Sequence, residues 1–437
     1  MKQLIVISCP IDTHSGYGAR SRDIVKSLLK TDKYDIKITP QKWGTTPFGF
    51  LEANNPEHKQ ILDCFLQSPQ LPRQPDIWIQ ITVPNEFQPI GKFNIGITAG
   101  IETTLCDPSW IEGINRMNLT LVSSQHAKNV FEGSAFEQRN KDTNQLVKVV
   151  KLEKPIEVLF EGIDINTYQK IDAADNSEVW DILDTIDEDF NFLFVGHWLQ
   201  GEIGQDRKDV GMMIKTFLET FKGKNKKPGL ILKTSGGVYS IMDRDSMLEK
   251  INSIRTAVGD DGTLPNIYLL HGELSDEEIN ELYNHPKVKV HISFTKGEGY
   301  GRPLIEATIS QKPVIASNYS GHIDFLDAEM STLLPGELKQ IHSSAVVQNM
   351  LISESSWFTV DYNKASEILK DVYKNYKKYL DGAKRQAYRS RTEFSLEKMA
   401  EKLNTILEEK VPKQVALKLP QLKKIELPKL KKIEDAK

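Results

Sequence analysis

Two carboxylates in the segment KGEGYGRPLIEATISQKPVIAS (residues 296–317) stand eight residues apart, Glu298 in a glycine-rich turn and Glu306 just after Pro303. The turn follows VKVHISF, whose alternating apolar residues predict a β-strand. Pro303 suits the first position of a helix, whose free N–H groups attract an anion such as a diphosphate. Glu306, one turn into that helix, is spaced to accept hydrogen bonds from the diol of a ribose. Glu298 would point beyond the anion toward a sugar, so the pattern predicts a nucleotide-sugar pocket.

The turn also carries three glycines, Gly297, Gly299 and Gly301. Glycine adopts positive φ without a steric penalty and allows another group to approach the backbone closely. We therefore expect these glycines to permit a sharp turn and the close approach of a ligand.

Positive charge is needed where a nucleoside diphosphate departs, because no metal site is evident to meet the developing charge. Arg207 and Lys208 stand just before a predicted helix that follows the strand FNFLFVG (190–196). We predict that both bind the diphosphate; the alternative is a solvated surface pair. His197, at the end of the strand, either donates to a phosphate or is structural. Lys233, at the end of the run LILK, is a further candidate to line the cleft.

The bulk composition is that of a soluble globular protein with two domains. The chain has 437 residues, of which 39% are hydrophobic and 27% charged, and a formal net charge of -4, which argues against a dedicated nucleic-acid binder. The three cysteines form no CxxC pair and the nine histidines no HExxH motif, so we expect reduced thiols and no protein-held metal. No apolar run is long enough to span a membrane or to form a signal peptide, and we expect a cytoplasmic protein.

Short β-branched runs alternate with helical periodicity through both halves of the chain, which predicts an α/β fold with parallel sheets. An acidic stretch between about 160 and 190 separates the halves. Two such halves would face each other across a cleft beyond their strand ends, where parallel sheets bind ligands. The predicted units are an acceptor-side Rossmann-like domain (1–165), a nucleotide-sugar-binding Rossmann-like domain (166–385), a helix returning to the first domain (386–410) and a tail (411–437).

The tail is compositionally distinct. LPQLKKIE (419–426) is followed directly by LPKLKKIE (427–434), and eight lysines against three acids give residues 411–437 a charge of about +5. Prolines eight residues apart exclude a long helix. The tail is either a disordered extension or a segment that docks on a partner or an anionic surface.

The segment GEGYGRPLIEATISQKPVIASNYSG (297–321) closely resembles the signature of the retaining glycosyltransferases of family 4, which have the GT-B fold of two Rossmann-like domains. The resemblance covers roughly residues 1–407, strongly in the second half and loosely in the first. It implies that Glu298 contacts the donor sugar and that Glu306 binds the ribose hydroxyls. The intervening backbone of Tyr300, Gly301 and Arg302 would meet the diphosphate.

The resemblance implies further contacts in other segments. The family usually has an arginine directly after the strand, where this chain has His197, and Lys208 is the better match to the family's lysine. The loop HSGYGARS, with Gly16 and Gly18, would close on the donor phosphates and the acceptor. Gly272, within the sequence His-Gly-Glu, would lie against the base.

The acceptor side is less defined. Glu102 and Thr103 follow the strand FNIGIT, and Glu102 either binds or deprotonates the acceptor hydroxyl or is a buried or capping residue. Ser124 and His126 have the same ambiguity at the next strand end. Two tryptophans, Trp43 and Trp110, are candidates to stack on a sugar or base. The alternative for each is a role in the core or on the surface.

We therefore predict a retaining, metal-independent glycosyltransferase, a hexosyl- or pentosyltransferase with a nucleoside-diphosphate sugar as co-substrate and no other cofactor. The acceptor hydroxyl is open: glycan, protein, small molecule or a hydroxylated viral DNA base. The alternatives are a nucleotide-sugar epimerase of the same fold and a non-catalytic nucleotide-sugar-binding protein. The acidic pair Asp243 and Asp245 lies apart from the predicted phosphate elements, which is why no metal is expected.

Overall fold

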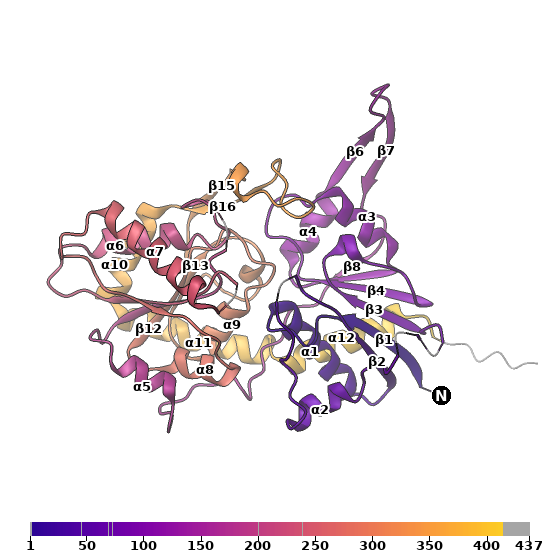
Figure 1. Cartoon of the computed structure of the whole chain (residues 1–437), viewed down its shortest axis with the longest axis horizontal. Coiled ribbons are helices and arrows are strands. Elements are labelled where there is room, and N and C mark those ends of the chain that lie inside the picture. Colours follow the sequence, from indigo (N-terminus) through magenta and orange to yellow (C-terminus); the bar gives the residue numbers. More distant parts are fainter. Residues whose placement is uncertain are drawn as a thin grey trace, which may run out of the picture.

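The computed structural model describes residues 2–44, 46–68, 70–71, 73–199, 201–237 and 239–413. These residues form two α/β domains side by side, each built on a six-stranded sheet (Figure 1). All strand pairings within the two sheets are parallel, as the alternation of strands and helices predicts.

The sheet of the first domain has the strand order β2-β1-β3-β4-β5-β8. Its central strands are apolar on both faces because helices cover both sides, and all five residues of β3 are buried. The strands are β1 (Gln3–Cys9), β2 (Tyr34–Pro40), β3 (Ile77–Ile81), β4 (Phe93–Thr98), β5 (Leu119–Val122) and β8 (Ile156–Val158).

Helices of the first domain start at side-chain caps: Ser15, Asp107 and Ser124 each accept a hydrogen bond from a first-turn N–H. These elements are α1 (Gly16–Leu29), α2 (Pro56–Leu62), η1 (Pro84–Glu86), α3 (Pro108–Arg116) and α4 (Gln125–Gly133). An antiparallel hairpin of β6 (Ala135–Arg139) and β7 (Leu146–Lys151) projects from this domain (Figure 1).

The second domain has the strand order β11-β10-β9-β12-β13-β14. The strands are β9 (Asn191–Val195), β10 (Gly229–Lys233), β11 (Ile267–Leu270), β12 (Val288–Ser293), β13 (Val314–Ser317) and β14 (Thr332–Leu334). A further antiparallel pair is formed by β15 (Gly336–Gln340) and β16 (Ser356–Val360).

Ser275 and Glu278 form a capping box at the start of α8, in which each side chain accepts a hydrogen bond from the backbone N–H of the other residue. The helical elements of the second domain are α5 (Glu178–Asp184), α6 (Val210–Phe221), α7 (Ile241–Val258), α8 (Asp276–Asn284), α9 (Arg302–Ile309), η2 (Gly321–Asp324), η3 (Ser343–Ala345), α10 (Tyr362–Lys374), η4 (Tyr376–Tyr379) and α11 (Leu380–Glu393).

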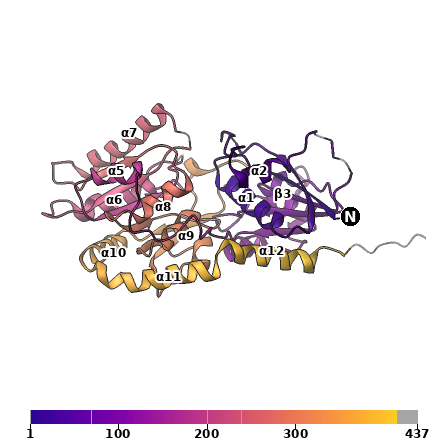
Figure 2. The ribbon, with the colours of Figure 1, turned by 90° about the horizontal axis from the view of Figure 1, so that it is seen from below.

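The last helix, α12 (Leu396–Lys410), crosses to the first domain and lies beneath it in Figure 2. Five of its apolar side chains join the core of that domain: Leu396, Met399, Leu403, Ile406 and Leu407. The range 386–410 predicted as a returning helix thus spans the end of α11, which stays with the second domain, and all of α12. Most of the predicted tail, residues 414–437, lies outside the described part of the chain. No helix within the described residues combines the length and apolarity needed to cross a bilayer.

The chain passes between the domains twice, and the two passages are bonded to each other. The N–H of Ile163 donates to the carbonyl of Phe394 at 2.9 Å, and the N–H of Leu396 donates to the carbonyl of Ile163 at 2.8 Å. Gly162 makes this approach possible, because a Cβ there would lie 2.5 Å from the Cα of Leu396.

We expect Gly162→Ala to lower the free energy of unfolding by about 1–3 kcal/mol, the usual cost of overpacking, since backbone atoms cannot rotate away. Gly133→Ala is the matched control, because nothing lies within 4 Å of a Cβ at Gly133. Thermal and denaturant unfolding measure the stability of both variants relative to wild type. Equal stability of the two variants would show that the passages are not packed this tightly.

Candidate functional site

A cavity of about 440 Å³ lies between the domains, beyond the carboxyl ends of the strands in both sheets. It is lined by ten of the twelve residues predicted for the site: Gly16, Glu102, His197, Arg207, Lys208, Glu298, Tyr300, Gly301, Arg302 and Glu306. The other two, Gly18 and Gly272, lie outside its lining. The structure therefore gathers residues from both domains around one cavity.

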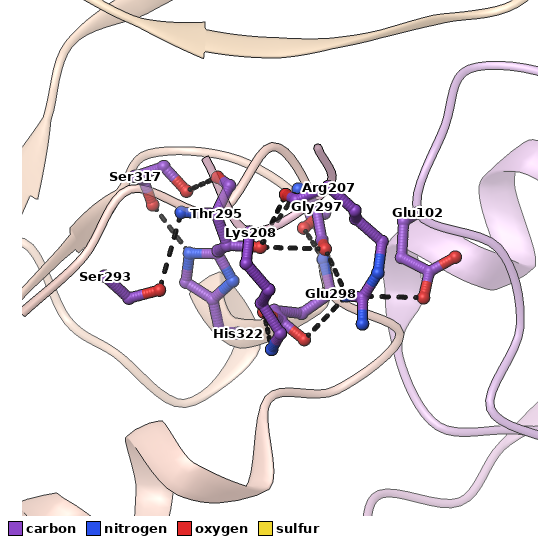
Figure 3. A network of polar contacts seen from close by, with 10 residues as sticks. Glu102, Arg207, Lys208, Ser293, Thr295, Gly297, Glu298, Ser317 and His322 are labelled. Carbon is purple, nitrogen blue, oxygen red and sulfur yellow. Dashed lines mark hydrogen bonds and ion pairs between the residues drawn. The ribbon is translucent and has the colours of Figure 1, made fainter. Parts of the chain in front are cut away.

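Glu298 is held by both predicted cations (Figure 3). The ammonium of Lys208 lies 2.5 Å from Oε1 of Glu298, and the guanidinium of Arg207 donates to Oε2 at 3.2 Å. Arg207 also donates to the carbonyl of Gly297 at 3.0 Å. The cations come from the loop before α6 and the carboxylate from the loop after β12, so the pairing joins two loops of the second domain.

Burial and the cations act in opposite directions on Glu298. Burial, which leaves Glu298 only 6% exposed, would raise the pKa of its carboxyl, but Lys208 and Arg207 lower that pKa to about 2. Burial lowers the pKa of Lys208, and Glu298 opposes that shift. Glu298 is therefore ionised at any physiological pH.

Hydrogen bonds behind Glu298 fix the turn that carries it. Its N–H donates to Oγ of Ser320 at 2.8 Å, and the hydroxyl of Thr295 donates to the carbonyl of Gly297 at 3.0 Å. The hydroxyl of Ser317 donates to the carbonyl of Thr295 at 2.6 Å, and the ring of His322 contacts the carbonyl of Ser317 (Figure 3). The turn is thus tied to the end of β13 and to η2.

Glu102 faces this cluster from the first domain. Its Oε1 lies 3.6 Å from the guanidinium of Arg207, so Arg207 is shared between the two domains (Figure 3). Glu102 is partly exposed to the cavity and is a charged partner of the second domain.

Two glycines of the turn serve the contact between the domains. A Cβ at Gly297 would lie 2.3 Å from the carbonyl oxygen of Glu102, and one at Gly299 would lie 2.7 Å from that of Ala99. Only Gly301, the N-cap of α9, has a positive φ, of 100°. Sequence reasoning expected all three to serve a ligand, but it had no means of placing the first domain against this turn.

Glu306 has a different environment from Glu298. It is 8% exposed, and the hydroxyl of Tyr283 donates to its Oε2 at a long 3.4 Å. Burial raises the pKa of Glu306 to about 7, although Arg302 opposes the shift from 3.7 Å away. A carboxylate this poorly satisfied retains capacity to accept hydrogen bonds from a ligand in the cavity.

Arg302 bridges the domains. Its guanidinium donates to Asp23 of α1 at 2.7 Å and lies 3.5 Å from Glu161, in the segment that leads out of the first domain. Glu161 in turn accepts a hydrogen bond from Ser123. Asp23 and Glu161 were missed by sequence reasoning, because nothing in their local pattern distinguishes them from surface acids.

Two further candidates from the sequence, His197 and Lys233, line the second-domain wall of the cavity. Burial, together with the nearby Lys208 and Arg207, lowers the pKa of His197 to about 4, so its ring is neutral and contacts the hydroxyl of Ser235 at 3.2 Å. Burial lowers the pKa of Lys233 to about 8, and its ammonium donates to the carbonyl of Gly272. Gly272 thus orients Lys233 rather than lining the cavity.

The first loop presents Gly16 to the cavity at the start of α1. Gly18 instead packs inside the loop, because a Cβ there would lie 2.2 Å from the carbonyl oxygen of Thr13. Tyr17, between them, lines the cavity, and its hydroxyl is hydrogen-bonded to Thr98 at 2.9 Å.

The other acceptor-side candidates have structural contacts. Trp110 is buried and its indole donates to the carbonyl of Asn349, while Trp43 stacks on Tyr17 with ring centroids 3.9 Å apart. Ser124 caps α4. The remaining two, which are likewise outside the cavity lining, are Thr103 and His126.

Among the described residues, no group of three or more histidine, cysteine, aspartate or glutamate side chains is arranged to hold a metal ion. Asp243 lies in the first turn of α7, where it accepts hydrogen bonds from the N–H of Gly236 and contacts His271 at 2.8 Å. Asp245 is exposed and pairs with Arg244.

One protein-family model matches part of this chain. The family model "Glycosyl transferases group 1" matches residues 263–336, which contain the turn, Glu298 and Glu306. No curated protein sequence matches the chain.

Solved structures match it over nearly its whole length. A glycosyltransferase from Rickettsia africae has a TM-score of 0.63 at 11% identity, with 94% of this chain and 100% of that one covered. A sucrose-phosphate synthase from Thermosynechococcus elongatus has a TM-score of 0.61 at 12% identity, with 94% and 99% covered. Anabaena Alr3699/HepE, in complex with UDP and glucose, has a TM-score of 0.57 at 13% identity, with 93% and 100% covered. At these identities the likeness establishes the fold, and the chain has the predicted GT-B fold of two Rossmann-like domains.

Proposed function

We propose that this protein is a retaining, metal-independent glycosyltransferase that moves a sugar from a nucleoside-diphosphate sugar to an acceptor hydroxyl. The observation that carries the proposal is the placement of Glu298, with its two cations, and of Glu306 at one interdomain cavity. The local match to group 1 glycosyltransferases and the UDP and glucose bound by Alr3699/HepE support it.

In this proposal the diphosphate lies beside Lys208 and Arg207 and over the N-terminus of α9, where backbone N–H groups favour an anion. Glu306 accepts hydrogen bonds from the ribose, and Glu298 faces the sugar. Donor binding must share Lys208 between the carboxylate of Glu298 and the phosphate. As the glycosidic bond breaks, charge grows on the phosphate and its attraction for both cations strengthens.

Retention of configuration is supported by the resemblance of residues 297–321 to the family 4 signature. The acceptor hydroxyl would attack on the face that the diphosphate leaves, and a phosphate oxygen would take its proton. Glu102, already paired with Arg207, would then orient the acceptor side of the cavity.

The direct test is a thermal-shift screen of UDP-, GDP- and ADP-sugars, followed by mass spectrometry of products formed with candidate acceptor hydroxyls. Transfer of the sugar with release of nucleoside diphosphate supports the proposal. Isomerised donor without transfer would establish the epimerase, and binding without any turnover would establish a non-catalytic binding protein.

Glu306→Ala is expected to weaken binding of the bare nucleoside diphosphate by about 1.5–3 kcal/mol, the range for hydrogen bonds to a charged group. Because the pKa of Glu306 is raised to about 7, this carboxyl is protonated below pH 7 and ionised above it. The advantage of the wild type over the variant should therefore grow between pH 6 and pH 8. Calorimetric titrations at several pH values measure this difference in affinity. The variant serves as the control for ionisation of the ligand's own phosphates. Equal affinities at pH 8 would remove Glu306 from the ribose site.

Glu298→Gln is expected to leave affinity for the bare nucleoside diphosphate within about threefold of wild type but to lower turnover of the sugar nucleotide at least tenfold, since its partner is the sugar. Steady-state kinetics and calorimetry with the two ligands separate the effects. A loss of affinity as large as the loss of turnover would contradict a role at the sugar.

Lys208→Ala is expected to reduce kcat by about 10²–10³-fold, the usual effect of removing one group that stabilises developing charge. Lys215→Ala, in α6, is the matched control, because Lys215 lies outside the cavity lining and pairs with Glu219 one turn further along the same helix. EDTA should leave the wild-type rate unchanged. Loss of activity with EDTA and recovery with magnesium or manganese would contradict metal independence.

A further inference from the structure

A second ion pair lies directly behind the one that holds Glu298. The ammonium of Lys296 lies 3.4 Å from Oδ2 of Asp209, and neither side chain is more than 1% exposed. Lys296 stands two residues before Glu298, and Asp209 directly follows Lys208. The two loops that meet in the cavity therefore also meet in the interior of the second domain.

The backbone conformation of Asp209 is unusual for the start of a helix. Asp209 has φ 52° and ψ 34°, a left-handed conformation that a residue other than glycine seldom adopts. It is the N-cap of α6 but makes no side-chain cap hydrogen bond. The capping role falls to Asp206, whose Oδ2 accepts from the N–H of Val210 at 3.1 Å. The carboxylate of Asp209 thus serves an interaction other than the start of the helix.

Further hydrogen bonds fix this ion pair on both sides. The hydroxyl of Tyr362 donates to Oδ2 of Asp209 at 2.7 Å, and the ammonium of Lys296 donates to the hydroxyl of Thr359 at 3.1 Å. The N–H of Lys296 donates to the carbonyl of Arg207 at 2.8 Å, which ties the two loops through the backbone as well.

A buried ion pair costs desolvation energy and is weak support for stability, so its retention calls for another explanation. Burial raises the pKa of Asp209, and Lys296 opposes that shift. The location of the pair supplies the explanation: displacement of either loop would separate Lys208 and Arg207 from Glu298, and misplacement of reacting groups by about 1 Å costs up to about 100-fold in rate.

We propose that Lys296 and Asp209 are positioning residues, which hold the loop of Arg207 and Lys208 at a fixed distance from the loop of Glu298 without touching the substrate. The expected effect of these residues on catalysis rests on the glycosyl transfer proposed above. The positioning itself is a property of the ligand-free protein.

The double variant Lys296→Met/Asp209→Asn is the central test. Either single substitution leaves a buried group without its partner and should lower Tm. The double variant removes both charges and keeps at Asp209 a side chain that tolerates the left-handed conformation. It should therefore regain most of the lost Tm. Its kcat should nevertheless remain at least tenfold below wild type, with KM changed less than threefold, because positioning acts mainly on the transition state.

Tyr362→Phe offers a milder variant that removes only one hydroxyl from the pair. It should lower kcat severalfold. Tyr268→Phe is the matched control, since Tyr268 donates to Glu188 at the same 2.7 Å in the same domain but outside the cavity lining. That control should retain wild-type kcat.

An activity-independent measurement completes the test. Lys208 and Arg207 depress the pKa of Glu298 to about 2, so ¹³C chemical shifts should show its carboxyl ionised at pH 4 in wild type and in Tyr268→Phe. In the double variant the loops separate and the pKa should rise toward the ordinary value, so that protonation becomes visible near pH 4. Glu298→Gln assigns the signal.

Each result decides one proposal. A double variant with wild-type kcat, or with Glu298 still ionised at pH 4, would overturn the positioning role. A wild-type protein that transfers no sugar would instead overturn the proposed function, while the chemical shifts of Glu298 would still support or overturn the positioning role.

Discussion

The buried carboxylate of Glu298 is the constraint on which the arrangement of the cleft depends. A carboxylate that is only 6% exposed must be paired, because desolvation of an isolated charge is prohibitive. Two adjacent cations, Arg207 and Lys208, meet that requirement, and they have to approach from a loop about ninety residues earlier in the chain. The sheet order brings that loop into place, since β9 lies beside β12 and both strands end at the cavity.

The same turn also determines how the domains meet. Its glycines at 297 and 299 admit the backbone carbonyls of Glu102 and Ala99, and Arg302 reaches Asp23 in the first domain. The segment that carries the candidate chemistry is therefore also part of the contact surface between the domains. Opening of the cleft would break contacts within the site itself, so we infer that domain movement and site geometry are coupled.

The sequence predicted the parallel sheets, the cleft and the meeting of Glu298, Glu306, Arg207 and Lys208 at one cavity, because strand ends and helix starts constrain these residues locally. It did not predict the partners of Arg302 or the inward-pointing Asp209. These contacts join segments far apart in the chain, and no local periodicity encodes them. The projecting hairpin (135–151) was likewise missed, since its strands bury little apolar surface.

The two glutamates of the signature differ in charge state because their environments differ. Glu298 has two cations within hydrogen-bonding distance, and its pKa falls to about 2. Glu306 is buried with one cation, Arg302, at 3.7 Å and one hydrogen-bond donor, the hydroxyl of Tyr283. Burial therefore raises the pKa of its carboxyl to about 7. Glu298 stays ionised at any physiological pH, so its electrostatic field remains constant at the position where charge would develop during sugar transfer. A carboxylate with few protein partners can bind a neutral diol, because the hydroxyls of the ligand donate to acceptor sites that no protein group occupies.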